Sequence, residues 1–153
     1  MSPLIPLLHK RLLAWYAENR RDLLWRRTRD PYAHLVVEVM LQQTGVDRVA
    51  PKYEEFLARF PDFASLAAAS LGEVIRAWGP LGYNRRALNL HRTARLVLEK
   101  YNGHLPSDLT TLGALPGIGP YTAAALACFA LGQEVSVVDT NVRRVLGRLL
   151  LGA

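Results

Sequence analysis

The sequence has 153 residues, half of them hydrophobic, which suits one folded domain and excludes a chain that is disordered throughout. Lys and Arg number 19 against 13 Asp and Glu, and the resulting net charge of +6 favours a polyanionic partner such as nucleic acid. The single cysteine, Cys128, excludes a disulfide framework or a multi-cysteine metal site in this chain.

No apolar run approaches the roughly 20 residues of a membrane span. The N-terminus has neither the basic segment nor the cleavage pattern of a signal peptide. We therefore expect a soluble, cytoplasmic protein with no membrane partner.

Helical periodicity begins near the N-terminus, where apolar residues recur at helix spacing over residues 8–16. Trp15 in this segment and Trp78 further on are expected in the core. Asp30 and Pro31 are typical of an N-cap and a first helical residue. Helices are predicted over residues 31–43, 46–60, 70–78, 85–101, 107–112, 120–131 and 140–149.

Strand signals are nearly absent from the sequence. The only candidate is residues 135–138, a short apolar run without a partner strand. The predicted fold class is therefore all-α.

Glu38 is the only charged residue in the segment 35–41, which is otherwise almost entirely apolar. A helix that is apolar all round is buried, and burial raises the pKa of a carboxyl group. A glutamic acid of this kind suits a general acid near neutral pH. The alternative is a glutamate at a helix edge that forms an ion pair with Arg48 or Arg85.

Asp139 directly precedes the last predicted helix, so it is expected to be its N-cap. Backbone N–H groups and the helix dipole should then keep this carboxylate ionised. The simpler interpretation is a cap with no other role. Together with Glu38, however, Asp139 would give one protonated and one ionised carboxyl group, which is the pair that cleaves a glycosidic bond.

Two glycines, Gly117 and Gly119, lie in a turn between two predicted helices. Glycine permits positive φ and lets a phosphate approach the backbone N–H groups at a helix start. Alone, this pattern also fits an ordinary turn. The longer string Leu-Pro-Gly-Ile-Gly-Pro-Tyr-Thr-Ala and the later Val-Val-Asp-Thr-Asn-Val-Arg-Arg-Val resemble the helix-hairpin-helix signature of base-excision DNA glycosylases, a superfamily that includes the endonuclease III and MutY adenine glycosylase families.

Upstream residues resemble the MutY family more closely. The matching segments are Leu24-Trp-Arg26, Pro31-Tyr32, Glu38-Val-Met-Leu-Gln-Gln-Thr44, Leu81-Gly-Tyr83 and Arg86-Ala-Leu-Asn-Leu-His91. The resemblance covers nearly the whole chain, and the string that starts at Glu38 is its most specific part.

The resemblance implies that Glu38 protonates a flipped adenine and helps to activate water, and that Asp139 stabilises the sugar cation. Tyr121 matches a tyrosine beside the reacting sugar. Gln43 and Tyr83 match residues that insert into the duplex, Tyr83 near the 8-oxoguanine that stays behind.

The resemblance also implies an adenine pocket and a phosphate-binding hairpin. The pocket residues are Trp25, Arg26 and Leu41. The residues of the hairpin are Leu115, Gly117, Ile118, Gly119 and Thr122, and its carbonyls often hold a monovalent cation in relatives.

Tyr121 bears on the type of reaction. The bifunctional endonuclease III type is similar to this chain but has a lysine there, which forms a Schiff base with the sugar and permits strand cleavage. A tyrosine implies a monofunctional, hydrolytic reaction. Without the resemblance, Tyr121 would be read as a half-buried residue at a helix start.

The resemblance implies a helix-hairpin-helix fold with a six-helix core over about residues 24–135, including the hairpin at 107–131. Residues 1–23 and 139–153 would form part of a second lobe that is incomplete, through fragmentation or natural truncation. Relatives carry a 4Fe–4S cluster on a C-terminal four-cysteine loop that this sequence lacks, so no cofactor and no metal is expected to be encoded here.

The expected activity is hydrolysis of adenine from mispairs with 8-oxoguanine or guanine in double-stranded DNA, by a monomeric enzyme that flips the base. Two alternatives are open. One is a glycosylase for thymine or uracil opposite guanine, against which the pair Gln42-Gln43 argues. The other is a DNA-binding module without activity.

Overall fold

The computed structural model describes residues 4–152, and in this part of the chain every regular element is helical. The α-helices are α1 (Leu4–Asn19), α2 (Pro31–Leu41), α3 (Val46–Arg59), α4 (Phe63–Ala68), α5 (Leu71–Trp78), α6 (Arg85–Tyr101), α7 (Leu109–Gly113), α8 (Pro120–Ala125) and α9 (Thr140–Leu151). The short helices are two 3-10 turns, η1 (Leu24–Arg26) and η2 (Gly79–Leu81), and a π-helix, η3 (Leu126–Ala130). The all-α prediction is confirmed.

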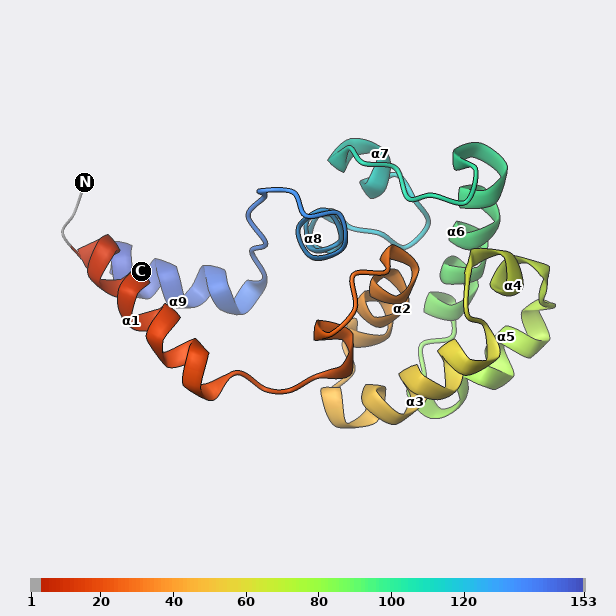
Figure 1. Ribbon diagram of the computed structural model, residues 1–153, viewed down its shortest axis with the longest axis horizontal. Helices are drawn as coiled ribbons and strands as arrows, with labels where there is room; N and C mark the ends of the chain where they lie inside the picture. Colours follow the sequence, from red (N-terminus) through yellow and green to blue (C-terminus); the bar gives the residue numbers. More distant parts are fainter. Residues whose placement is uncertain (1–3, 153) are drawn as a thin grey trace.

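The helices fall into two groups in space. Helices α2 to α8 form one body, and α1 and α9 extend from it at the end of the molecule where both termini lie (Figure 1). A stretch without regular secondary structure over residues 132–139 leads from the body to α9. The chain therefore leaves the body after η3 and reaches α9 without a strand among the described residues.

Helix α2 is the centre of the body, because it contacts α3, α6, α8 and η3. Its N-cap is Asp30, whose side chain accepts a hydrogen bond from the backbone N–H of Tyr32 at 3.0 Å, and Pro31 occupies the first turn, as predicted. Leu35, Val36 and Met40 are fully buried. Residues on all sides of this helix are thus in the core.

Helix α4 was not predicted from the sequence. It has six residues, too few for an apolar period to be recognised. A capping box between Asp62 and Ser65 starts it, and Phe63 and Leu66 bury its inner face, which packs against α6. The capping box predicted at Ser70 is present and starts α5.

Helices α1 and α9 contribute nothing to the core of the body. No residue of α9 is buried, and no described side chain of α1 is buried either. The expectation that Trp15 lies in the core is wrong, because its side chain is 60% exposed, whereas Trp78 is completely buried as predicted. The apolar periodicity correctly predicted a helix at α1. The apolar face of that helix, however, is not covered by other described residues.

Candidate active site

Glu38 occupies the middle of α2, between buried neighbours on both sides in the chain. Its side chain forms no ion pair among residues 4–152, and Arg48 donates instead to the carbonyl oxygen of Pro80. Burial raises the pKa of Glu38 to about 7. Glu38 is partly exposed rather than fully buried. Its raised pKa nevertheless agrees with the prediction from the sequence, and the lack of an ion pair among the described residues argues against the alternative considered there.

Asp139 is the N-cap of α9. Its Oδ1 accepts a hydrogen bond of 2.6 Å from the backbone N–H of Val142. The predicted cap is therefore present, and the positive end of the α9 dipole lies beside this carboxylate.

Glu38 and Asp139 line the same cavity, which has a volume of about 1040 Å³. All six residues predicted for catalysis or for the adenine pocket line it: Glu38, Tyr121, Asp139, Trp25, Arg26 and Leu41. They come from η1, α2, the first turn of α8 and the start of α9. The folded chain thus brings together groups that lie more than a hundred positions apart in the sequence.

Tyr121 lies close enough to both carboxylates for each to affect its pKa. Burial raises the pKa of the Tyr121 hydroxyl, and the negative charges of Glu38 and Asp139 raise it further. The side chain is nevertheless 43% exposed. It is a neutral hydrogen-bonding group at the wall of the cavity, available to a molecule that enters.

The cavity also has a basic rim, of which only Arg26 was predicted from the sequence to belong to the site. Its arginines are Arg20, Arg21, Arg26, Arg27 and Arg29. Arg27 forms an ion pair with Asp22, and the guanidinium of Arg26 lies over the ring of Tyr16 at 5.6 Å.

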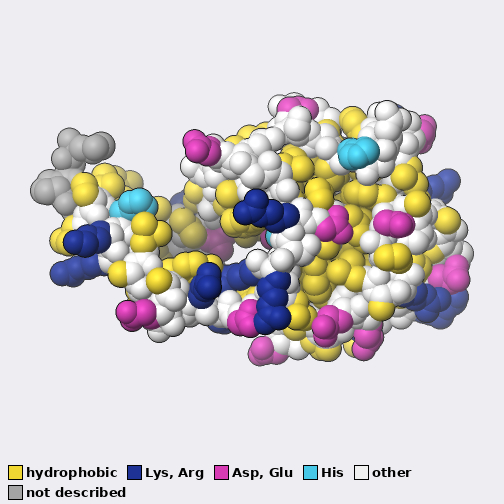
Figure 2. Space-filling view, in the orientation of Figure 1, with side chains coloured by type: hydrophobic (Ala, Val, Ile, Leu, Met, Phe, Trp, Pro, Cys, Tyr) yellow, Lys and Arg dark blue, Asp and Glu magenta, His cyan; other side chains and the backbone are white. Residues whose placement is uncertain are grey.

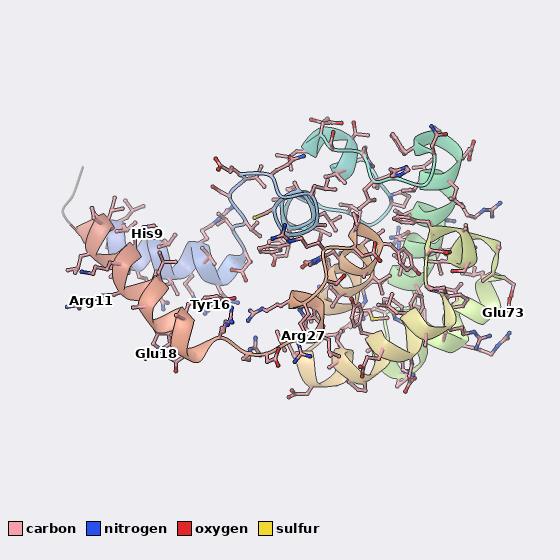
Figure 3. All side chains as sticks on the ribbon, in the orientation of Figure 1. His9, Arg11, Tyr16, Glu18, Arg27 and Glu73 are labelled. Carbon is pink, nitrogen blue, oxygen red and sulfur yellow. The ribbon has the colours of Figure 1, made fainter. Side chains whose placement is uncertain are left out.

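This rim lies at the junction between the two groups of helices. Lys and Arg side chains gather where the α1 and α9 end meets the body (Figure 2). Tyr16 projects from α1 toward the segment that carries Arg27 (Figure 3). The dense run of arginines between α1 and α2 was the available sequence signal, because charge of one sign around a cleft attracts a ligand of the other sign.

The predicted hairpin lies between α7 and α8, and of its two glycines only Gly117 has positive φ, whereas Gly119 has φ of −88°. Gly117 has φ of +76°, which favours glycine. The side chains of Leu115, Ile118 and Thr122 are buried. Any contact of these three residues with DNA would therefore be made by their backbone.

The hairpin is fixed to the end of α2. Gln42 donates through Nε2 to the carbonyl oxygen of Gly117 at 3.2 Å and to Oγ1 of Thr122 at 3.4 Å. The carbonyl of Pro116 accepts from Thr93 Oγ1 at 3.1 Å. Two hairpin carbonyls in the predicted cation-binding turn thus already accept internal side-chain hydrogen bonds.

Gln43 and Tyr83, the two residues predicted to insert into DNA, do not line the cavity. Both are exposed, and both have positive φ, +56° and +48°. Positive φ is uncommon for residues other than glycine and often marks functional positions. A buried arginine, Arg86, connects the two segments that carry them, and no role was predicted for it from the sequence.

The residues present do not fit an iron–sulfur cluster. Cys128 is the only cysteine, and within residues 4–152 no group of three His, Cys, Asp or Glu side chains is placed to hold a metal ion. In the same part of the chain, no helix combines the length and the apolar composition that crossing a bilayer requires.

The fold and the cavity define a class of protein, and comparison with known proteins gives the same class. A family model described as "HhH-GPD superfamily base excision DNA repair protein" matches residues 36–152. The chain belongs to this superfamily. Its curated relatives include the adenine DNA glycosylase of Mycolicibacterium smegmatis, which is 52% identical across 93% of this chain and 49% of the relative.

The human adenine DNA glycosylase is 46% identical across 90% of this chain and 27% of its own length. The chain thus spans about half the length, or less, of these curated relatives. Among solved structures, a thermostable thymine-DNA glycosylase matches with a TM-score of 0.88 and 33% identity, over 93% of this chain and 66% of that one. A non-covalent endonuclease III–DNA complex matches with a TM-score of 0.84 and 26% identity, over 95% and 67%. The predicted helix-hairpin-helix glycosylase fold is confirmed.

Proposed function

We propose that this chain is a monofunctional DNA glycosylase that removes adenine mispaired with 8-oxoguanine or guanine. The observation that carries the proposal is the presence of Glu38, Asp139 and Tyr121 around one cavity. The adenine specificity is supported by the names of the curated relatives.

The reaction begins when the mispaired adenine leaves the base stack, because a base inside a duplex is out of reach of an enzyme's side chains. The cavity volume of about 1040 Å³ lies at the upper end of the range of small-molecule sites, roughly 300–1,000 Å³. Trp25 and Leu41 provide apolar walls for the base, and Arg26 provides hydrogen-bond donors.

Glu38 acts as the general acid. With a pKa of about 7, a large share of its carboxyl groups is protonated near neutral pH, and protonation of the base makes it a better leaving group. The carboxylate then accepts a proton from the attacking water. Asp139 remains an anion and stabilises the positive charge that develops on the sugar.

Tyr121 holds the position at which a lysine would form a Schiff base with the sugar. A phenol forms no imine, so water is the nucleophile and the products are free adenine and an abasic site. The phosphate backbone remains intact until another agent, such as alkali, cleaves it.

DNA binding relies on two basic or polar surfaces. The backbone N–H groups of Gly117 and Gly119 at the start of α8 suit a phosphate, and the rim arginines of the cavity suit the phosphates next to the extruded nucleotide. Gln43 and Tyr83 enter the duplex beside it.

A second candidate function is removal of thymine or uracil opposite guanine. The structural likeness to a thymine-DNA glycosylase at 33% identity favours testing it. The third candidate is a DNA-binding module that releases no base.

One experiment distinguishes the three functions. The chain is incubated in excess with end-labelled duplexes that contain adenine opposite 8-oxoguanine, adenine opposite guanine, thymine opposite guanine or uracil opposite guanine, and each sample is then treated with alkali. Alkali-dependent cleavage at adenine alone supports the proposal. Cleavage only at thymine or uracil contradicts it, as does mismatch binding without any cleavage.

A further inference from the structure

Arg86 is buried, although it faces no carboxylate. It is the second residue of α6, its exposed fraction is 9%, and it forms no ion pair within residues 4–152. A buried charge is costly unless hydrogen bonds compensate for the loss of water. The acceptors around this guanidinium therefore indicate why it is tolerated.

One side of the guanidinium binds the end of α2. Nη1 of Arg86 donates to the carbonyl oxygens of Val39 at 3.2 Å, Met40 at 2.8 Å and Gln42. These are the carbonyls that a helix C-terminus leaves without intrahelical donors. Arg86 thus caps the C-terminal end of α2, whose C-cap residue Gln42 directly precedes Gln43.

The other side of the guanidinium binds the turn that precedes α6. Nη2 of Arg86 donates to the carbonyl oxygens of Leu81 and Gly82, both at 3.2 Å, and to Oγ1 of Thr44 at 3.0 Å. Its Cζ atom lies 5.3 Å from the centre of the Trp78 ring, which is a favourable cation–π distance. One side chain therefore joins two loops that are distant in the sequence.

Each of these loops presents one exposed residue with left-handed backbone. Gln43 follows the Gln42 acceptor and has φ of +56°, and Tyr83 follows the Gly82 acceptor and has φ of +48°. Such conformations persist where the surrounding structure fixes them. The guanidinium also lies over the ring of Tyr83, with 5.5 Å between Cζ of Arg86 and the ring centre.

We infer that Arg86 is a positioning residue for base extrusion, which holds Gln43 and Tyr83 at a fixed separation and in left-handed backbone so that both side chains enter the duplex together. The inference rests on the proposed function, which assigns these two side chains to the duplex. Arg86 itself touches no DNA in this scheme. Its effect passes through the backbone of the two loops.

The substitution Arg86→Lys tests this role. Lysine keeps the charge, but its single ammonium group has three N–H donors and lacks the planar fork that spans both loops. We expect base extrusion and the single-turnover rate of adenine release to fall roughly tenfold, since small displacements of positioning groups have effects of this size or larger. Arg95→Lys, an exposed position on the same helix, is the matched control and should change neither quantity.

Extrusion is measured apart from chemistry. The probe is a duplex that carries 2′-fluoro-2′-deoxyadenosine opposite 8-oxoguanine, with 2-aminopurine beside it, because the fluorine suppresses glycosidic cleavage and the fluorescence of 2-aminopurine rises when its neighbour leaves the stack. If the fluorescence rises with the unsubstituted chain and rises equally with Arg86→Lys, the inference about Arg86 is overturned while the proposed function stands. No rise with the unsubstituted chain contradicts the proposed function itself.

A double-mutant cycle distinguishes the proposed positioning role of Arg86 from a role in stability alone. In a chain that carries Gln43→Ala and Tyr83→Ala, Arg86→Lys should cause no further loss of extrusion, because nothing remains to be positioned. The same fold-loss in both backgrounds overturns the inference. Circular dichroism at the assay temperature verifies that each variant is folded.

Thr44→Val provides a second variant if Arg86→Lys does not fold. It removes one acceptor of the guanidinium and keeps the arginine. Extrusion should fall roughly two- to threefold, as for loss of one modest hydrogen bond, and this fall should vanish in the Gln43→Ala, Tyr83→Ala background. An unchanged extrusion signal, or an equal fall in both backgrounds, overturns the inference.

Discussion

Glu38 and Asp139 line one cavity, but of these two carboxyl groups only that of Asp139 accepts a hydrogen bond from a backbone N–H of the described residues. Burial of Glu38 favours its neutral form and raises its pKa to about 7. The N-terminus of α9 instead stabilises negative charge on Asp139. The two carboxyl groups therefore differ in the charge state that their surroundings favour. The difference arises because Glu38 lies in the middle of a helix and Asp139 at the start of one.

Replacement of Glu38 by Gln removes the proton donor and nearly preserves the size of the side chain. The single-turnover rate of adenine release should fall by about 10³-fold, within the usual range for a general acid, while mismatch binding remains. In the unsubstituted chain, the rate should fall as the pH rises above about 7, because the acid form is lost. Glu99→Gln, at an exposed position of α6, is the control; turnover unaltered by Glu38→Gln would remove this residue from the mechanism.

The raised pKa of Glu38 also predicts a pH-dependent stability. Between the unfolded value of 4.5 and the folded value of about 7, the folded chain retains a proton that the unfolded chain releases, so stability decreases as the pH rises through this window. Above it, the ionised Glu38 costs up to about 3 kcal/mol. Glu38→Gln should therefore raise Tm at a pH of about 8 and have little effect at about 4. Equal shifts in Tm at both values would contradict the burial of this carboxyl group.

Asp139→Asn separates the capping role of this residue from its charge. Asparagine caps helices as well as aspartate does, so the free energy of unfolding should change by less than about 1 kcal/mol. Adenine release should slow by about 10²-fold or more, because the sugar cation loses its anion. Asp62→Asn changes a comparable cap, with a 2.7 Å bond to the backbone N–H of Ser65, at the start of α4. If both variants retain full activity, Asp139 is only a cap.

Tyr121→Lys should change the type of reaction. The new amine would project into the cavity that holds Glu38 and Asp139 and could attack the sugar to form a Schiff base. Sodium borohydride would then trap a covalent protein–DNA adduct, visible as a band of reduced mobility in a denaturing gel. Tyr121→Phe should give no adduct, and failure of the lysine variant to give one would place the sugar elsewhere.

Gly117→Ala tests the hairpin. An added Cβ would lie 2.9 Å from the side chain of Asn89, and φ there is +76°. We expect a loss of about 1–2 kcal/mol in stability. Duplex binding should weaken roughly tenfold at every sequence, equivalent to one lost hydrogen bond to a phosphate. Gly113→Ala, where no heavy atom lies within 4 Å of the new Cβ, is the control for stability.

Local sequence signals predicted most of the body. The Asp30–Pro31 start of α2, the apolar run around Glu38 and the capping box at Ser70 depend on residues within one or two helical turns, and the structure confirms each. Helix α4 was missed because six residues give too short a period. Trp15 was placed in the core because an apolar stripe marks a face but does not show what covers it.

Arg86 shows a different limit of sequence-based prediction. Its position near the start of an amphipathic helix resembles that of an exposed arginine, and its partners are mostly backbone carbonyls of other segments. Every residue has such a carbonyl, so no residue type in the sequence marks the site. The positive φ of Gln43 and Tyr83 has the same origin, since neighbouring segments impose it.

Helix α9 carries Asp139 as its N-cap but buries none of its own side chains. Local opening requires little free energy where few apolar contacts are lost. Amide hydrogens of α9 should therefore exchange with solvent far sooner than those around Glu38 in α2. On heating, α9 would consequently unfold and separate Asp139 from Glu38 before the body of the protein melts. The upper temperature limit of catalysis would therefore lie below the melting temperature of the body.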